Sequence, residues 1–470
     1  MLVDKVAKGG SSIDVSFVTE WKLGPAEFRA WYYGMGSVAH YSGNYAPRFV
    51  VEGPGTYDND HVKISSAGTQ YKHTYTIGAA IALDGSEAKL ATGQLMEIEC
   101  SQFLDTPPVG RANYYGTVFL YEVGKGGLVP WFTAGNFDDK STERENSHKL
   151  DEKGWLGGRT TLPYQYSDEP DNHYLQMATN LSSVNAQPFV LGRRVHHTSV
   201  VDGSHDESVE NGKLDALAGI AGPYYVNHSC DACHTRNGRA KVAEVGEPLA
   251  TWVVKLGTAA GDPDPRSGRV LQPRAADGKQ GEGSVTIARW VESSGLRTPT
   301  FAFSGVTPAT FSARIAPPLV GMGLLEAIAE DTVLAREDVQ DRDGDGISGK
   351  AQIVMDPAHG EPRLGRLGWK AGASSVRHQT AAALNTDMGV LTSVLPLPDC
   401  GVEQSGCGNA GGPELSDEHL AQLVKYISLL GIRARRGLDD ARALRGEALF
   451  EQTKCTACHT PTFTTSPHHP

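Results

Sequence analysis

The chain has 470 residues, too many for one ordinary hydrophobic core, so we expect two or three domains. It carries 43 Lys and Arg residues against 55 Asp and Glu residues, which gives a formal net charge of -12. This acidic balance argues against nucleic acid as a partner and allows a small redox protein or a small neutral molecule. No apolar run reaches the roughly 18 residues of a membrane span, so none is expected.

Residues 1–184 have the pattern of a β-rich domain. Short runs of β-branched and aromatic residues at 49–51, 71–77, 95–100 and 118–123 are separated by turns rich in Gly, Pro, Asp and Asn. This spacing predicts a β-sandwich or jelly-roll-like domain. Its many aromatic side chains either line a groove for a polysaccharide or another surface partner, or fill the core. They are Trp21, Trp31, Tyr32, Tyr33, Tyr114, Tyr115 and Trp131.

Beyond residue 185 the pattern changes to helices and long loops rich in Gly and Pro. A Cys-x-x-Cys-His motif stands here at Cys230, Cys233 and His234, and it recurs at Cys455, Cys458 and His459. In each copy the two Cys can form thioethers to one haem, and the His can supply an axial nitrogen to the iron. The two copies therefore predict two covalent haem c groups.

A zinc knuckle and a thioredoxin-like redox pair are two other interpretations of these motifs. A zinc knuckle would need four Cys or His ligands, and each motif offers only three close together. A thioredoxin-like redox pair would lie at the head of a helix and would not need a His after each Cys-x-x-Cys. Covalent haem is the interpretation that explains both copies.

A loop between the two motifs resembles the first half of an EF-hand calcium site. Asp341, Asp343 and Asp345 alternate, Gly346 allows the turn, and Ile347 can offer its carbonyl oxygen. The usual closing Glu is replaced by Gln352, so water or a distant ligand would have to complete the shell. A bound Ca²⁺ and a solvated acidic turn both remain open.

Cys400 and Cys407 bracket a short loop that contains Gly401 and Gly406. Covalent haem attachment takes place in an oxidising, exported compartment, where such a pair can form a disulfide. We therefore expect a disulfide here, with two free thiols as the alternative.

Two helices are predicted near the C-terminus. One begins at the cap Ser416, buries apolar side chains three and four residues apart, and ends at Gly431. The second covers residues 439–453, leads into Cys455 and looks like the first helix of a class I cytochrome c. A weaker match to that helix lies at 192–195, ahead of Cys230.

These patterns predict a mainly α-helical, cytochrome c-like di-haem core with long loops. Residues 185–436 are expected to form a first haem domain that holds the inserted loops and the calcium-like loop, and residues 437–470 to begin a second. Only 11 residues follow His459, too few to cover the far face of a haem, so we expect the second domain to be truncated.

Further segments at 221–225, 315–328, 343–349, 365–370, 378–380 and 387–389 carry a family resemblance. Together with the haem motifs, they make the stretch from about 188 to 459 similar to the bacterial di-haem oxidoreductase family. Its members are described as di-haem cytochrome c peroxidases and are often labelled thiol oxidoreductases. The first 184 residues lie outside this resemblance.

The resemblance implies roles for particular residues. His234 and His459 would be the proximal iron ligands, and His378 or Met388 would close one haem as a distal ligand, with Met322 and Met355 less favoured. Trp369 would relay electrons between the haems, and Gln379 would donate a hydrogen bond to bound peroxide. Each of these side chains also fits a plain packing role.

The expected function is therefore that of a di-haem c-type oxidoreductase that reduces peroxide at one haem with electrons relayed through the other from a small redox protein. The alternatives are a di-haem electron carrier without peroxidase activity, or a surface-binding or polysaccharide-binding protein with an accessory haem module. Haem attachment implies a periplasmic or secreted protein, yet residues 1–12 lack the apolar core of a signal peptide. Either a signal was removed ahead of Met1, or the sequence is an expressed segment.

Overall fold

The computed structural model describes residues 2–19, 27–32, 48–52, 61–65, 68–81, 86–103, 114–124, 151–162, 173–178, 180–181, 183–206, 212–276, 278–342, 344–408 and 412–467. The chain divides into two compact units. Unit 1 consists of Met1–Ser183 and Leu430–His459, and unit 2 of Val184–Leu429 and Thr460–Pro470. The first haem motif therefore lies in unit 2 and the second in unit 1.

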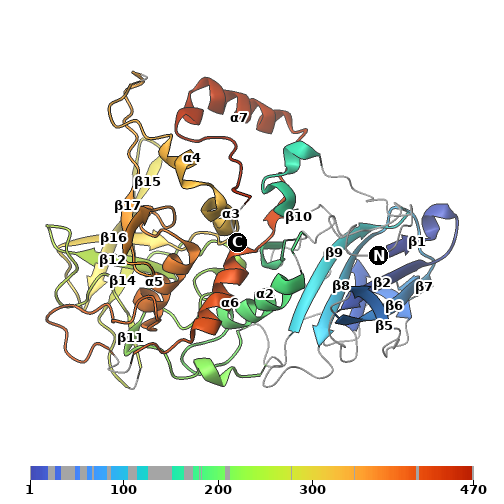
Figure 1. Cartoon of the computed structure of the whole chain (residues 1–470), viewed down its shortest axis with the longest axis horizontal. Coiled ribbons are helices and arrows are strands. Elements are labelled where there is room, and N and C mark those ends of the chain that lie inside the picture. The colour runs from blue at the N-terminus through green and yellow to red at the C-terminus, as the bar shows by residue number, and fades with distance from the viewer. Residues whose placement is uncertain are drawn as a thin grey trace. The chain divides into compact units, whose positions relative to one another are not determined.

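Unit 1 contains an antiparallel sheet, coloured blue to cyan in Figure 1, in the order β1-β2-β6-β4-β3-β8-β9, with β5 and β7 also paired to β6. Strands are present at all four predicted places. The sandwich itself stays a prediction. The strands are β1 Leu2–Asp4, β2 Ile13–Thr19, β3 Glu27–Tyr32, β4 Arg48–Glu52, β5 His61–Ser65, β6 Gly68–Ile81, β7 Glu87–Ala88, β8 Leu95–Phe103 and β9 Tyr114–Glu122.

Successive side chains along these strands point to opposite faces of the sheet, and those on one face form a hydrophobic core. Ile13, Ile77 and Ile98 come from three different strands and are almost fully buried there. β1 and β9 stand at opposite ends of the strand order, yet the Tyr121 hydroxyl donates a hydrogen bond of 2.7 Å to the buried Asp4 carboxylate. The sheet must therefore curve enough to bring its two end strands together. The side chains of the aromatic residues proposed for a polysaccharide groove lie outside the described set.

The remaining part of unit 1 connects residues 151–178 with residues 430–459. The short strands β10 Thr161–Leu162 and β19 Ile432–Arg433 pair in parallel. Backbone hydrogen bonds of 2.8 Å from Gly431 to Gln176 and 3.0 Å from Arg435 to Gly154 extend this connection. α7 (Ala441–Gln452) follows, capped by Asp440, and leads into a 3-10 turn at Cys455–Ala457. The helix predicted over 439–453 is confirmed.

Unit 2 combines helices with two-stranded antiparallel pairs. Its α-helices are α2 Ser183–His196, α3 Met322–Ala327, α4 Glu330–Leu334, α5 Val376–Met388 and α6 Asp417–Ser428. Its strand pairs are β11 Tyr224–Tyr225 with β13 Arg274–Ala275, β12 Trp252–Gly257 with β16 Thr310–Ile315, β14 Ser284–Ser293 with β15 Leu296–Ser304, and β17 Ile353–Asp356 with β18 Glu361–Leu364.

α3 and α5 both pack against α6, and α2 lies beside it (Figure 1). Ser416 caps it by accepting a hydrogen bond from the His419 N–H, as the sequence predicts. Gly192 of α2 and Gly323 of α3 each lie so close to the backbone of α6 that an added Cβ would collide with the carbonyl oxygens of Gln422 and Ser428. These two glycines allow the helices to approach one another directly.

Within the described residues, no helix is both long and apolar enough to cross a bilayer.

Candidate functional site

The two Cys-x-x-Cys-His motifs adopt the same turn. The backbone N–H groups of Cys233 and His234 donate to the Cys230 carbonyl at 3.2 and 2.9 Å. In the second copy the N–H groups of Cys458 and His459 donate to the Cys455 carbonyl at 3.3 and 2.9 Å. Both loops therefore hold their two Cys and one His in one tight turn, as attachment to a single haem requires.

The haem loop of unit 2, residues 229–237, is anchored on both sides of its motif. The Ser229 hydroxyl accepts from the Ala232 N–H at 3.2 Å, and the Asp231 carboxylate accepts from the Arg236 N–H at 2.6 Å. Beyond the motif, the buried Asn237 amide donates to the Tyr426 hydroxyl of α6 at 2.7 Å. The conformation of this loop is therefore held by side-chain hydrogen bonds within it and by the contact with α6.

His234 is oriented by a backbone carbonyl. Its Nδ1 lies 2.7 Å from the Pro317 carbonyl oxygen, which can only accept, so Nδ1 carries the proton and Nε2 is left as the basic nitrogen. Burial lowers the pKa of His234, which favours the neutral imidazole that binds iron. A metal-binding His commonly donates its other N–H to a carbonyl in this way. The donor set of the first motif therefore fits a c-type haem.

The two thiols of the first motif are poorly ionised. Burial raises the pKa of Cys230 to about 12 and that of Cys233 to about 11. The negative charge of Asp387 contributes to both shifts, and the Asn227 amide opposes the shift of Cys233 by donating to its Sγ at 3.5 Å. A low thiolate fraction disfavours thiol–disulfide exchange at these two Cys residues.

Asp387 lies close to this motif, and the sequence analysis assigns it no role. The N–H groups of Val226 and Asn227, just ahead of Cys230, donate to its backbone carbonyl at 2.7 and 3.2 Å. Its carboxyl accepts from the Thr386 hydroxyl at 2.7 Å, and burial raises its pKa. An acid in the last turn of a helix faces the negative end of the helix dipole. This unfavourable position of an acid near the C-terminal end of a helix is the feature by which Asp387 could have been noticed in the sequence.

The two predicted distal ligands lie at opposite ends of α5. His378 is in the first turn and Met388 is the last residue, so ten residues at about 1.5 Å each separate them by about 15 Å along the helix axis. They cannot serve the same iron. Met388 is buried beside Asp387, whereas His378 is partly buried and its pKa is lowered by burial.

The His378 ring is held by a polar chain. Its Nδ1 lies 3.1 Å from the Ser374 hydroxyl, which donates to the buried Asp356 carboxylate at 2.7 Å. This contact uses Nδ1 and leaves Nε2 for a metal or a proton.

Trp369 and Gln379 flank the start of α5. Trp369 is 66% exposed, and its indole N–H donates to the Ile315 carbonyl at 3.4 Å. Gln379 is partly buried, and its Oε1 lies 3.0 Å from the point where a Cβ on Gly368 would stand. An exposed Trp is not filling core, so the packing alternative for Trp369 loses support.

The second motif is more open. Cys458 and His459 are exposed, and the His459 ring packs against Phe450 of α7 with ring centroids 5.7 Å apart. Lys454, just ahead of the motif, takes a left-handed conformation with φ of 60° and ends the helix.

The calcium-like loop turns its described carboxylates toward its own backbone. Asp341 accepts from the Gly346 N–H at 3.1 Å, and Asp345 accepts from the Ile347 N–H at 2.8 Å. Asp343 lies outside the described residues. A calcium site stays a prediction. Cys400 and Cys407 are joined in a disulfide with their Cα atoms 5.8 Å apart.

A comparison with protein families finds one match. Residues 307–469 match a family described as "Di-haem oxidoreductase, putative peroxidase". This confirms the resemblance seen in the sequence over these residues, which include Asp387 and the second motif. The first motif and the β-rich residues lie outside the match. No curated protein and no solved structure matches the chain.

Proposed function

From the match of residues 307–469 to the di-haem oxidoreductases, we propose that this chain is a di-haem c-type oxidoreductase that reduces peroxide. Peroxide would be reduced at the first haem, with electrons relayed through the second from a small redox protein. The observation that carries the proposal is the contact between Asp387, inside the matched segment, and residues 226–227 at the first motif. A partly buried acid with a raised pKa is thereby held next to the residues that would bind haem.

The reaction sets the requirements for the site. One hydrogen peroxide, two electrons and two protons give two waters, so cleavage of the O–O bond needs a proton on the departing oxygen, and the second proton completes the other water. When bound at Cys230, Cys233 and His234, haem would supply an iron that passes the electrons one at a time. The protein must supply the protons.

Asp387 is the proposed proton donor and acceptor. Its raised pKa keeps the carboxyl protonated closer to neutral pH than an ordinary Asp, which is the property a general acid needs. The Thr386 hydroxyl holds the side chain, and the two backbone N–H donors fix its Cα beside the haem loop.

His234 is the proposed iron ligand of the first haem, and Pro317 orients it. The hydrogen bond from Nδ1 to the Pro317 carbonyl fixes the ring and increases its electron donation through Nε2. Since Pro317 lies in the family-matched segment and His234 outside it, this bond also links the two parts of the proposed site.

We assign His378 and Trp369 to electron transfer. His378 is too far along α5 from Met388 to act at the same iron, and its Nε2, which the Ser374 contact does not use, would be available to an iron. The exposed Trp369 would accept electrons from a small redox protein. We also propose export to the periplasm, because haem attachment of this kind takes place there.

The test replaces Asp387 with Asn in the haem-loaded protein and measures peroxide turnover with a one-electron dye donor. Loss of the acid should lower kcat/KM for peroxide about 100- to 10,000-fold, with haem content unchanged. Asp262→Asn, at an exposed position in unit 2, is the matched control and should retain wild-type turnover.

Two outcomes would contradict this account. Wild-type turnover in Asp387→Asn would remove Asp387 from the reaction. A wild-type protein with only low-spin haem in its spin-resonance spectrum and no peroxide turnover would favour the electron-carrier alternative.

A further inference from the structure

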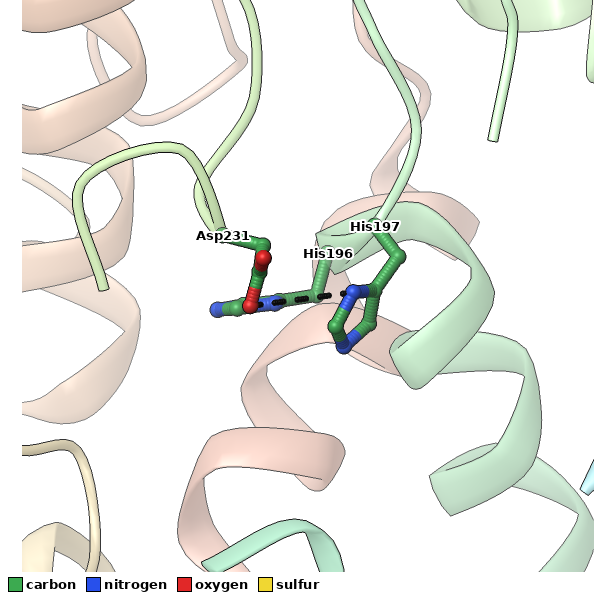
Figure 2. A group of neighbouring side chains, drawn as sticks. All are labelled: His196, His197 and Asp231. Atoms are coloured by element: carbon green, nitrogen blue, oxygen red, sulfur yellow. Dashed lines mark ion pairs between the residues drawn. The ribbon is translucent and has the colours of Figure 1, made fainter. Parts of the chain in front are cut away.

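Three potential metal ligands lie close together at the first haem motif, and one of them, Asp231, is part of it. Figure 2 shows His196 and His197, at the C-terminal end of α2, facing Asp231 of the haem loop. One ligand atom from each residue lies within 4.8 Å of the others. Both His residues are completely buried, whereas Asp231 is partly exposed. None of the three was singled out by sequence reasoning.

His196 is the residue that requires an explanation. Neither of its ring nitrogens has a hydrogen-bond partner among the described residues, although the side chain has no exposed surface. Its ring packs against Tyr426 and His197, with centroids 5.2 and 5.0 Å away. A buried polar atom without a partner costs about 1–3 kcal/mol, and an aromatic hydrocarbon ring would fill the same space without that cost. A polar ligand at His196 removes the penalty.

The carboxylates around His197 have the spacing of a metal site. His197 Nδ1 lies 3.8 Å from Asp231 Oδ1 and 3.0 Å from Asp206 Oδ1. Ligand atoms around a tetrahedral zinc ion, each about 2.0–2.2 Å from the metal, stand about 3.3 Å apart. Small side-chain rotations would therefore bring the three ligands into range, with Asp206 beside them as a fourth ligand or an orienting partner.

We propose that His196, His197 and Asp231 bind a divalent transition-metal ion, with zinc the best fit, at a centre distinct from the haem irons. Two imidazoles and one carboxylate suit zinc and exclude calcium and magnesium, which prefer oxygen ligands. The ion ties the end of α2 to the haem loop through residues far apart in the chain. It therefore adds a second link to the loop beside the Asn237–Tyr426 contact, since the His196 ring packs against the same Tyr426.

The test measures zinc and haem together in the haem-loaded full chain. After incubation with zinc chloride and removal of the excess, elemental analysis should find about one zinc per chain in the wild type. His196→Phe, which keeps an aromatic ring against Tyr426, should lose that zinc and keep its haem. His228→Gln removes an exposed His two residues ahead of Cys230 and should keep both.

A second variant keeps the proposal testable if the His196→Phe protein misfolds. Asp231→Asn keeps an oxygen that can accept from the Arg236 N–H but lacks the charge, so it should bind zinc at least about tenfold more weakly. X-ray absorption at the zinc edge should show two imidazoles in the wild type.

The proposal is wrong if the fully haem-loaded wild type retains no zinc, or if His196→Phe and Asp231→Asn retain as much as the wild type. The zinc-to-chain ratio is measured independently of peroxide turnover. A failure of the zinc proposal therefore leaves the proposed function untouched, and a failure of the proposed function leaves the zinc proposal untouched.

Discussion

Glu282 is the residue whose protonation most clearly affects stability. Burial raises its pKa from 4.5 to about 7, although its carboxylate accepts from the Gln272 N–H at 2.7 Å and from the Gln404 amide at 2.6 Å. Between those two pH values the folded protein holds a proton that the unfolded chain releases. The free energy of unfolding should therefore fall as the pH rises from 4.5 to about 7, by at most a few kcal/mol.

Glu282→Gln should flatten this dependence. Thermal midpoints measured from below pH 4.5 to above pH 7 should decline less in the variant than in the wild type, because the amide does not titrate. Some decline should remain, since burial also raises the pKa of Asp387 and of Asp399. Glu292→Gln, at an exposed position in β14, should follow the wild type. Parallel curves for Glu282→Gln and the wild type would show that Glu282 titrates normally.

Functional residues could be predicted from the sequence where all members of a site lie within a few positions of one another. The spacing of Cys230, Cys233 and His234 is a local pattern, and so is that of the second copy. Asp387 and His196 could not be found in this way, because their importance comes from residues 226–227 and Asp231, which tertiary structure brings to them.

Gly192 provides a test at the level of helix packing. A Cβ there would collide with the Gln422 carbonyl and with the Tyr426 Cβ where α2 meets α6. Gly192→Ala should therefore destabilise unit 2 by about 1–3 kcal/mol through overpacking. The matched control is Gly446→Ala in α7, where an added Cβ meets nothing within 4 Å. It should stabilise its helix by about 0.5–1 kcal/mol.

Thermal unfolding followed by circular dichroism compares the two variants directly. A lower midpoint for Gly192→Ala and an unchanged or higher midpoint for Gly446→Ala are expected. Equal midpoints for both variants would contradict the close approach of α2 to α6.

Among the elements, the two C-terminal helices were the most predictable. α6 combines a Ser416 cap with apolar residues three and four apart, and α7 has its Asp440 cap just inside the predicted range. The pairing of β10 with β19 could not be predicted, because two-residue strands more than 250 positions apart leave no periodic signal. Neither could the tautomer of His234, which depends on the Pro317 carbonyl.

At the scale of the whole molecule, the two haem motifs lie in different compact units. Residues 430–459 group with the N-terminal unit, and the first motif lies among the helices of unit 2. The sequence places the start of a second domain at 437, whereas this segment connects through β19 to residues 151–178. The spacing of neighbouring residues is enough to identify each Cys-x-x-Cys-His motif. The compact unit to which each motif belongs depends instead on contacts between residues far apart in the sequence.

The leading prediction for the whole molecule is that each Cys-x-x-Cys-His turn carries one covalent haem. Its most direct test is the denatured mass of protein exported from a host that matures cytochromes c, together with the pyridine haemochrome spectrum. We expect two haem additions for the wild type and one for the double variant Cys455→Ala and Cys458→Ala. Colourless wild-type protein of unmodified mass, with those four thiols free or bound to zinc, would contradict it.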